Sequence, residues 1–428
     1  MNNTTDRAVT TRREVLKAGT AAAAAMAIPR AVHAAGSDVL KVGLVGCGGR
    51  GTGAAGQALN ADKNVVLTAV GDAFADRLKS SLESLKKKLP DKVKVDADHC
   101  FVGLDAYKQV IDSGIDVVVL TTPPGFRPAH IKYAVEKGKH IFCEKPMAVD
   151  APGAKMVLEA CEEARKKNLS VVSGFCWRYS YPERAVFQKI HEGAVGDIVA
   201  VYGTYNTGFL WSHPRKPEYS DVEWQVRNWL YFTWLSGDHI VEQAVHTIDK
   251  MAWAMGDKPP LRAVGTGGRQ VRTDPQFGNI FDHFAIVYEW PDGVRGFHYC
   301  RQQGNTAGDV SDYILGTKGI ASVLGSPSHA IRSGGQTVWK YEGPRNDMYQ
   351  TEHDELFASI RAGKPMNDGP RMVNSTMMAI MGRMAAYTGQ VVTWEKAINS
   401  QEKLMPEKLE WGPMPVAPVA KPGVTKLI

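Results

Sequence analysis

The residues best suited to chemistry begin with a glycine-rich run directly after an apolar segment. Val39–Val45 predicts a β-strand, and the run Gly46-Cys47-Gly48-Gly49-Arg50-Gly51 that follows matches G-x-G-x-x-G. In this pattern the first glycine allows a tight turn, the second lets the backbone approach a diphosphate, and the third lets a helix pack closely. The N–H groups that open the helix attract phosphates. The run therefore predicts a dinucleotide site with these candidate binding residues: Gly46, Gly48, Gly49, Arg50 and Gly51.

An acidic residue at the end of the next apolar segment indicates which dinucleotide is bound. Val65–Gly71 predicts a second strand, and Asp72 follows it directly. A carboxylate there accepts hydrogen bonds from the ribose hydroxyls and repels a 2′-phosphate. The pattern favours NAD over NADP, although Asp72 could instead cap the following helix.

A carboxylate and an imidazole could share one helix face further along the chain. The apolar positions of residues 239–255 predict a single helix, on which Glu242 and His246 are four residues apart. A histidine of near-neutral pKa is suited to accept a hydroxyl proton while a hydride leaves the same carbon. The other interpretation is an ordinary i,i+4 pair on a solvated helix face.

Aromatic and polar side chains in the second half of the chain could bind a carbohydrate. Nine aromatics lie between Tyr205 and Trp234. Their faces could stack on sugar rings, or they could form a packing or oligomer surface. The candidate substrate-binding residues are Arg178, Trp211, Arg227, Trp229 and Asp249.

The elements that must position these residues fall into two halves. Strand and helix patterns alternate up to residue 175, which predicts a doubly wound parallel sheet of the Rossmann type. Thr121, Pro123 and Glu144 follow predicted strands, so they join the glycine run at the ligand-binding edge. From residue 176 consecutive strands predict an open-faced, mostly antiparallel sheet. The predicted divisions are residues 1–34, 35–175, 176–400 and a proline-rich extended tail, 401–428.

Together, the glycine run, Asp72, the Thr-Pro-Pro loop at 122–124 and Glu144-Lys145-Pro146 resemble the Gfo/Idh/MocA oxidoreductase family over most of the chain. The resemblance implies that Lys145 lies between nicotinamide and substrate and hydrogen-bonds the reacting hydroxyl. It also implies that His246 is the general base and that Glu242 orients it. This chain has Glu242 where the family has aspartate. The family also implies a homodimer or homotetramer formed through the open sheet face.

The N-terminal segment predicts an export signal rather than folded structure. Thr11-Arg12-Arg13-Glu14-Val15-Leu16-Lys17 precedes an alanine-rich stretch and a small-residue cleavage site at Ala34, which resembles a twin-arginine signal. The sequence therefore predicts a periplasmic or otherwise exported protein. Because this route moves folded proteins, we expect the six cysteines, which lack C-x-x-C or zinc spacing, to form neither disulfides nor a metal site.

The composition excludes several classes of protein. Of 428 residues, 44% are hydrophobic and 22% are charged, which is typical of globular domains. No apolar run reaches the ~20 residues of a membrane span. The formal net charge of +6 is small and dispersed, so no nucleic-acid partner is expected.

These features predict an exported oxidoreductase that acts on a secondary hydroxyl of a carbohydrate or polyol. Outside the cytoplasm no nicotinamide pool is at hand, so a tightly bound NAD that is recycled in place fits best. One alternative is an NAD-dependent glycoside hydrolase that works by transient C3 oxidation and elimination. Another is a non-catalytic sugar-binding protein.

Overall fold

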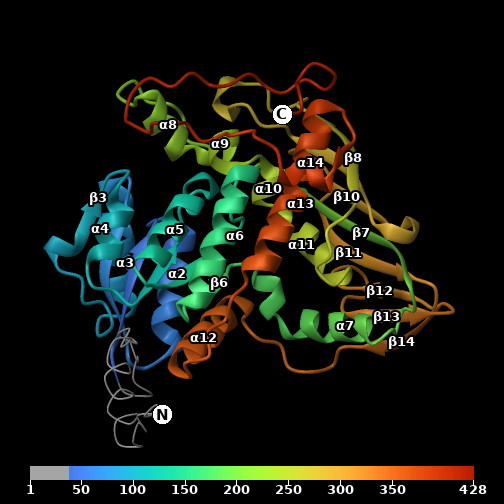
Figure 1. The fold of residues 1–428 in the computed structure, drawn as a ribbon, viewed down its shortest axis with the longest axis horizontal. Helices are drawn as coiled ribbons and strands as arrows, with labels where there is room; N and C mark the ends of the chain where they lie inside the picture. The colour runs from blue at the N-terminus through green and yellow to red at the C-terminus, as the bar shows by residue number, and fades with distance from the viewer. Residues whose placement is uncertain (1–37) are drawn as a thin grey trace, which may run out of the picture.

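The computed structural model describes residues 38–428, which form two β-sheets with helices packed around and between them (Figure 1). The predicted export signal, residues 1–34, lies outside the described residues. Within residues 38–428, no helix combines the length and the apolar character needed to cross a membrane. All six cysteines are free thiols.

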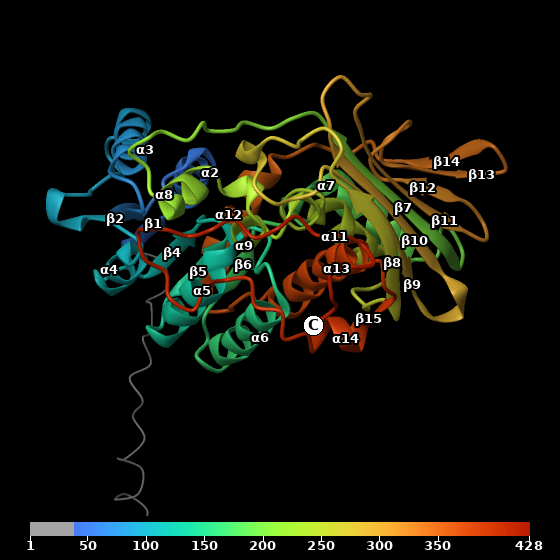
Figure 2. The same cartoon turned by 90° about the horizontal axis from the view of Figure 1, so that it is seen from above.

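The first half contains a six-stranded sheet in the order β3-β2-β1-β4-β5-β6, and every pairing is parallel. Its strands are β1 (Leu40–Val45), β2 (Val65–Asp72), β3 (Cys100–Val102), β4 (Val117–Leu120), β5 (His140–Cys143) and β6 (Val171–Ser173). Helices cover both faces of this sheet, as its apolar strands require (Figure 2). They are α2 (Gly49–Ala61), α3 (Ala75–Lys88), α4 (Ala106–Asp112), α5 (Arg127–Glu136) and α6 (Ala151–Lys166), with short 3₁₀ turns η1 (Ala97–His99) and η2 (Pro124–Phe126).

The second half contains a nine-stranded sheet in the order β14-β13-β12-β11-β7-β10-β9-β8-β15. Of the strand pairings described in this second sheet, only that of β7 with β10 is parallel. The strands are β7 (Ile198–Thr207), β8 (Arg262–Gly268), β9 (His283–Glu289), β10 (Arg295–Gln302), β11 (Asp309–Gly316), β12 (Ile320–Ser322), β13 (Ala330–Ser333), β14 (Gln336–Lys340) and β15 (Val392–Thr393). The predicted fold class, a parallel Rossmann sheet followed by a mostly antiparallel sheet, is confirmed.

Eight helices follow β6 along the chain. They are α7 (Tyr181–His191), α8 (Asp221–Arg227), α9 (Thr233–Ser236), α10 (His239–Glu242), α11 (Val245–Ala254), α12 (Met348–Arg361), α13 (Gly369–Thr388) and α14 (Trp394–Ile398). The 3₁₀ turns are η3 (Cys176–Tyr179), η4 (Trp229–Tyr231), η5 (Pro275–Phe277) and η6 (Pro291–Gly293). Helix α13 is almost wholly buried, because it packs on β8, on α6 of the Rossmann half and on α11.

Two sequence predictions about these helices need correction. The predicted single helix over 239–255 is two helices, α10 and α11, because the i→i−4 hydrogen-bond pattern is interrupted around Gln243 and Ala244. Helix α12, expected in the second domain, packs against α2, and its Leu356 and Phe357 belong to the apolar core of the Rossmann half. The chain therefore returns to its first half after completing the second sheet.

Candidate active site

The carboxyl edge of the Rossmann sheet borders a cavity of about 460 Å³. The glycine run, Asp72 and residues 121–123 line one side of it. These segments meet there because β1, β2 and β4 are parallel neighbours, so their carboxyl ends lie at one edge. Eight of the ten predicted cofactor residues line this cavity, namely Gly46, Gly48, Gly49, Arg50, Gly51, Asp72, Thr121 and Pro123, whereas Glu144 and Lys145 lie outside its lining.

The glycines of this run fall into two groups, according to whether a Cβ atom at that position would clash with neighbouring atoms. A Cβ on Gly51 would lie 1.9 Å from the carbonyl oxygen of Gly46, and Gly46 itself has φ +98°. The fold alone therefore requires glycine at these two positions. At Gly48 and Gly49 a Cβ would meet no described atom within 4 Å. Because both face the cavity, the room that they leave fits the diphosphate of a dinucleotide.

Asp72 ends β2 and braces the glycine run. Its carboxylate accepts the Cys47 N–H at 2.6 Å and the Phe74 N–H at 2.9 Å. Burial raises the pKa of Asp72, while these two amides partly offset that effect. The carboxylate is thus held at the cavity wall, at the place where an adenosine ribose is recognised in this fold.

Arg50 links the glycine run to the Glu144 loop. Its guanidinium forms an ion pair with Glu144 and a second with Glu352 of α12 at 3.1 Å. Glu352 is fully buried, and burial together with the nearby Glu144 carboxylate raises its pKa well above the usual value. Arg50 therefore contacts protein carboxylates on one side while it also lines the cavity.

Lys145 is anchored by α10. Its ammonium donates to the backbone carbonyl of Glu242 at 2.5 Å and to the Glu242 carboxylate at 3.1 Å. Both side chains are largely buried, with 13% and 14% exposed. The two residues are 97 positions apart in sequence, and their contact joins the loop after β5 to the second half of the chain.

His246 lies near Lys145 but is not paired with Glu242 as predicted. Its ring packs edge-on against Phe175, and its Nδ1 is buried with no hydrogen-bond partner within residues 38–428. Burial and then the positive charges of Lys145 and Lys250 lower the pKa of His246 well below its usual value. Glu242 ends α10, His246 lies in the first turn of α11, and the Glu242 carboxylate pairs with Lys145.

Arg178 and Asp249, which were predicted to bind substrate, lie outside the lining of this cavity and contact each other. Arg178 donates to Asp249 at 2.8 Å and to Asp257, and Ser375 donates to Asp249 at 2.7 Å. Both Arg178 and Asp249 are almost fully buried. Their charged groups are matched to one another, so this arrangement favours a structural role at the junction of η3 and α11.

Trp211, Arg227 and Trp229, the other predicted substrate-binding residues, lie at a cavity wall. All three line the cavity that the glycine run and Asp72 border. Lys145, Glu242 and His246 lie outside that lining. Two of the nine aromatics of this segment, Trp211 and Trp229, therefore border the dinucleotide site.

Several residues near the predicted site escaped the sequence analysis. Tyr205 of β7 lies close to Glu242, and burial followed by that carboxylate raises the pKa of Tyr205 to about 12. Glu352 reaches Arg50 from 302 residues away. Phe74, Arg77 and His213 line the cavity. Only Phe74 and Arg77 carried a sequence signal, because they directly follow the predicted ribose-binding aspartate.

Comparison with known proteins agrees with this geometry. Residues 40–173 match the description "Oxidoreductase family, NAD-binding Rossmann fold" of Gfo/Idh/MocA proteins, and residues 184–322 match the C-terminal domain of the same family. Among curated relatives, inositol 2-dehydrogenase of Salmonella typhimurium is 26% identical over 340 residues. That alignment covers 76% of this chain and 87% of the relative.

Solved structures share the fold at lower identity. Aldose-aldose oxidoreductase from Caulobacter crescentus, complexed with glycerol, has a TM-score of 0.65 at 17% identity, covering 83% of this chain and 99% of that one. Levoglucosan dehydrogenase, in complex with NADH and levoglucosan, has a TM-score of 0.65 at 19% identity with the same coverage. Both family descriptions fall on this chain in order and together span more than half of it. The chain therefore belongs to the Gfo/Idh/MocA family of NAD-binding oxidoreductases.

Proposed function

We propose that this protein oxidises a secondary hydroxyl group of a carbohydrate or polyol and passes the hydride to bound NAD. The observation that carries the proposal is the anchored Lys145, held by Glu242 close to the buried His246 and joined through Glu144 and Arg50 to the glycine run. The named substrates of relatives support the substrate class, since they include inositol and levoglucosan.

In the proposed reaction Lys145 donates a hydrogen bond to the substrate oxygen, and His246 accepts the hydroxyl proton. The Lys145 ammonium has three N–H donors, and Glu242 takes two of them, so one remains for the oxygen of a substrate hydroxyl. A positive charge there stabilises the alkoxide that develops. Burial keeps His246 neutral, and its unpartnered Nδ1 can accept the hydroxyl proton. NAD, when bound, supplies the hydride acceptor.

We further propose that the protein is exported by the twin-arginine route with its cofactor inside. The Arg12-Arg13 pair and the small-residue cleavage site support export. Fractionation of cells that express the full chain tests the location. Chromatography and mass analysis of nucleotide released from the denatured exported protein tests retention. Stoichiometric NAD supports the proposal, while an empty exported protein contradicts it.

The reaction itself is tested by replacing Lys145 with methionine. Protein loaded with NAD is mixed rapidly with polyols and aldoses, and the absorbance of the bound reduced nicotinamide is followed over a single turnover. We expect Lys145→Met to lower the rate of this reduction by about 10²–10⁴-fold, because the ammonium acts at the reacting oxygen. NADH affinity, measured by fluorescence titration, should change little, since the variant keeps the glycine run and Asp72.

A lysine on the outer face of α6 provides the matched control. The Lys166 side chain is 74% exposed, so Lys166→Met should keep the wild-type rate. Full activity in Lys145→Met would overturn the proposed role. Release of an aglycone from a chromogenic glycoside without net nicotinamide reduction would instead identify a redox-neutral hydrolase.

A further inference from the structure

The cavity at the glycine run has a second wall that comes from outside the Rossmann sheet. Residues 208–236, here called the cap, contribute Trp211, His213, Val226, Arg227 and Trp229 to its lining. Helices α8 and α9 belong to the cap and lie on the Rossmann side of the molecule (Figures 1 and 2). The described cavity is thus enclosed between the glycine run and a segment of the second half.

Specific contacts hold the cap against the loop and helix that follow Asp72. The Arg227 guanidinium lies 3.8 Å from the centre of the Phe74 ring and forms an ion pair with Asp76 at 3.2 Å. The His213 ring nitrogen Nε2 lies 3.2 Å from the Arg77 guanidinium. These contacts fall beside the residue that recognises the adenosine ribose in this fold.

The C-terminal segment, residues 402–428 and here called the strap, crosses the outside of the cap. The Val222 N–H donates to the Gly412 carbonyl at 3.2 Å, and the Gln225 side-chain amide donates to the Met414 carbonyl at 2.7 Å. The Trp411 ring packs on Phe74 with ring centres 5.6 Å apart. The strap therefore contacts both the cap and the loop after β2.

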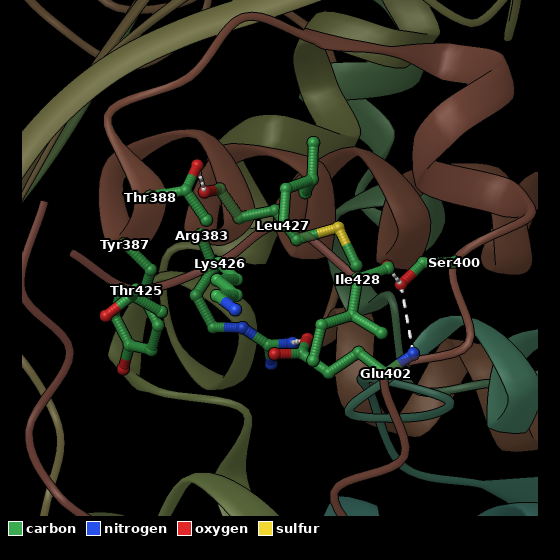
Figure 3. A pocket seen from close by; sticks show the side chains of 10 residues that line it. Arg383, Tyr387, Thr388, Ser400, Glu402, Thr425, Lys426, Leu427 and Ile428 are labelled. Carbon is green, nitrogen blue, oxygen red and sulfur yellow. Dashed lines mark hydrogen bonds and ion pairs between the residues drawn. The ribbon is translucent and has the colours of Figure 1, made fainter. Parts of the chain in front are cut away.

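Both ends of the strap are fixed to the body of the protein. The Leu404 N–H donates to the Asp150 carboxylate at the start of α6 at 2.8 Å. At the other end the Ser400 hydroxyl donates to the backbone carbonyl of Ile428, and Figure 3 shows the last residues beside Arg383 of α13. Arg383 in turn pairs with Glu402 at 2.9 Å.

An apolar core shared by three segments completes this arrangement. Phe74 packs with buried cap residues, and apolar strap residues lie against the same cluster. The cap supplies Val222, Trp224, Val226, Leu230, Tyr231, Phe232, Trp234 and Leu235, and the strap supplies Leu404, Met405, Leu409 and Met414. Burial of this much apolar surface holds the cap closed.

We propose that the cap, held by the strap, completes the binding site for the adenosine-diphosphate half of the cofactor and retains it between turnovers. In this site Arg77 and His213 are cofactor-binding residues, because a guanidinium and an imidazole at the cavity wall suit an anionic diphosphate. Exit of the nucleotide then requires the cap contacts to break. The inference rests on the proposed function, since it takes NAD as the ligand.

The experiment measures nucleotide release rather than turnover. The full chain is loaded with NADH, passed through gel filtration and then mixed with excess NAD, while the fluorescence of bound NADH is followed. We expect His213→Ala in the cap and Trp411→Ala in the strap each to speed dissociation about tenfold or more. Trp411 is 44% exposed, so its replacement should leave the fold intact, and the thermal midpoint checks this.

Trp339→Ala is the matched control, because Trp339 lies on β14 in the second sheet. It should release NADH at the wild-type rate. If His213→Ala and Trp411→Ala fold and release NADH as slowly as the wild type, the cap does not retain the cofactor. If the wild type binds no NADH in a direct titration, the proposed function fails instead.

Discussion

At the scale of single residues, Lys145 and Asp72 are each fixed by contacts with other parts of the protein. Lys145 is held by two oxygens of Glu242, and Asp72 by two backbone amides. A side chain that is held in place in this way can bind a ligand without a rearrangement of the protein. Each of the two side chains can also be replaced singly to measure its contribution.

Replacing Asp72 with serine should weaken the preference for NADH over NADPH. The carboxylate repels the 2′-phosphate of NADPH. Its removal should therefore lower the dissociation constant for NADPH relative to that for NADH by about 10–100-fold. Fluorescence titration with each nucleotide measures this ratio. Asp116→Asn is the control, since Asp116 contacts Lys41 near the start of β1. An unchanged ratio in Asp72→Ser would mean that Asp72 does not read the ribose.

At the scale of elements, buried charges join segments that the chain order keeps apart. Arg178 of η3 and Asp249 of α11 form an ion pair whose side chains are 3% and 2% exposed. Arg50 similarly joins α2 to α12 through Glu352. A buried pair of this kind adds little net stability by itself, but the loss of one partner leaves an uncompensated charge.

Arg178→Met should therefore lower the free energy of unfolding by about 3–5 kcal/mol. The double variant Arg178→Met with Asp249→Asn should lose less than the sum of the single variants, because it removes the stranded charge. Chemical denaturation measures these values. Arg184→Met breaks the partly exposed pair with Glu355 and should cost only about 0–1 kcal/mol. Equal losses for Arg178 and Arg184 would contradict the argument.

At the scale of the whole molecule, neutral histidines are buried in both halves. Burial lowers the pKa of His130 to about 3 and that of His298 to about 3. His246 and His353 are shifted in the same direction, also chiefly by burial. In the folded protein these rings stay neutral at pH values where an unfolded histidine, with a pKa of about 6.5, takes up a proton.

The stability of the protein should therefore fall as the pH drops below about 6.5. The unfolded state binds more protons there, so each such histidine costs about 2 kcal/mol by pH 5. Denaturant unfolding between pH 7 and pH 5 measures the slope. The slope of the unfolding free energy against pH reports how many protons the protein takes up on unfolding. His298→Gln, which keeps a polar partner for Thr247, should lower that number by about one. A slope equal to that of the wild type would show that His298 titrates normally.

The sequence by itself determined both sheets, most of their strands and the dinucleotide edge. The strands predicted at 39–45 and 65–71 match β1 and β2 to within one residue at each end. The predicted glycine run and Asp72 lie at the carboxyl ends of these strands and line the cavity. These features are local: hydrophobic periodicity and turn residues act over a few positions, so they can be read along the chain.

Only the tertiary structure decided which of these residues meet. It paired Lys145 with Glu242, paired Arg178 with Asp249, and placed Trp211 and Trp229 at the wall of the dinucleotide cavity. It also split the helix that was expected to carry Glu242 and His246 on one face. Contacts between segments a hundred or more residues apart depend on how whole elements pack. The spacing of residues within a single element does not predict that packing.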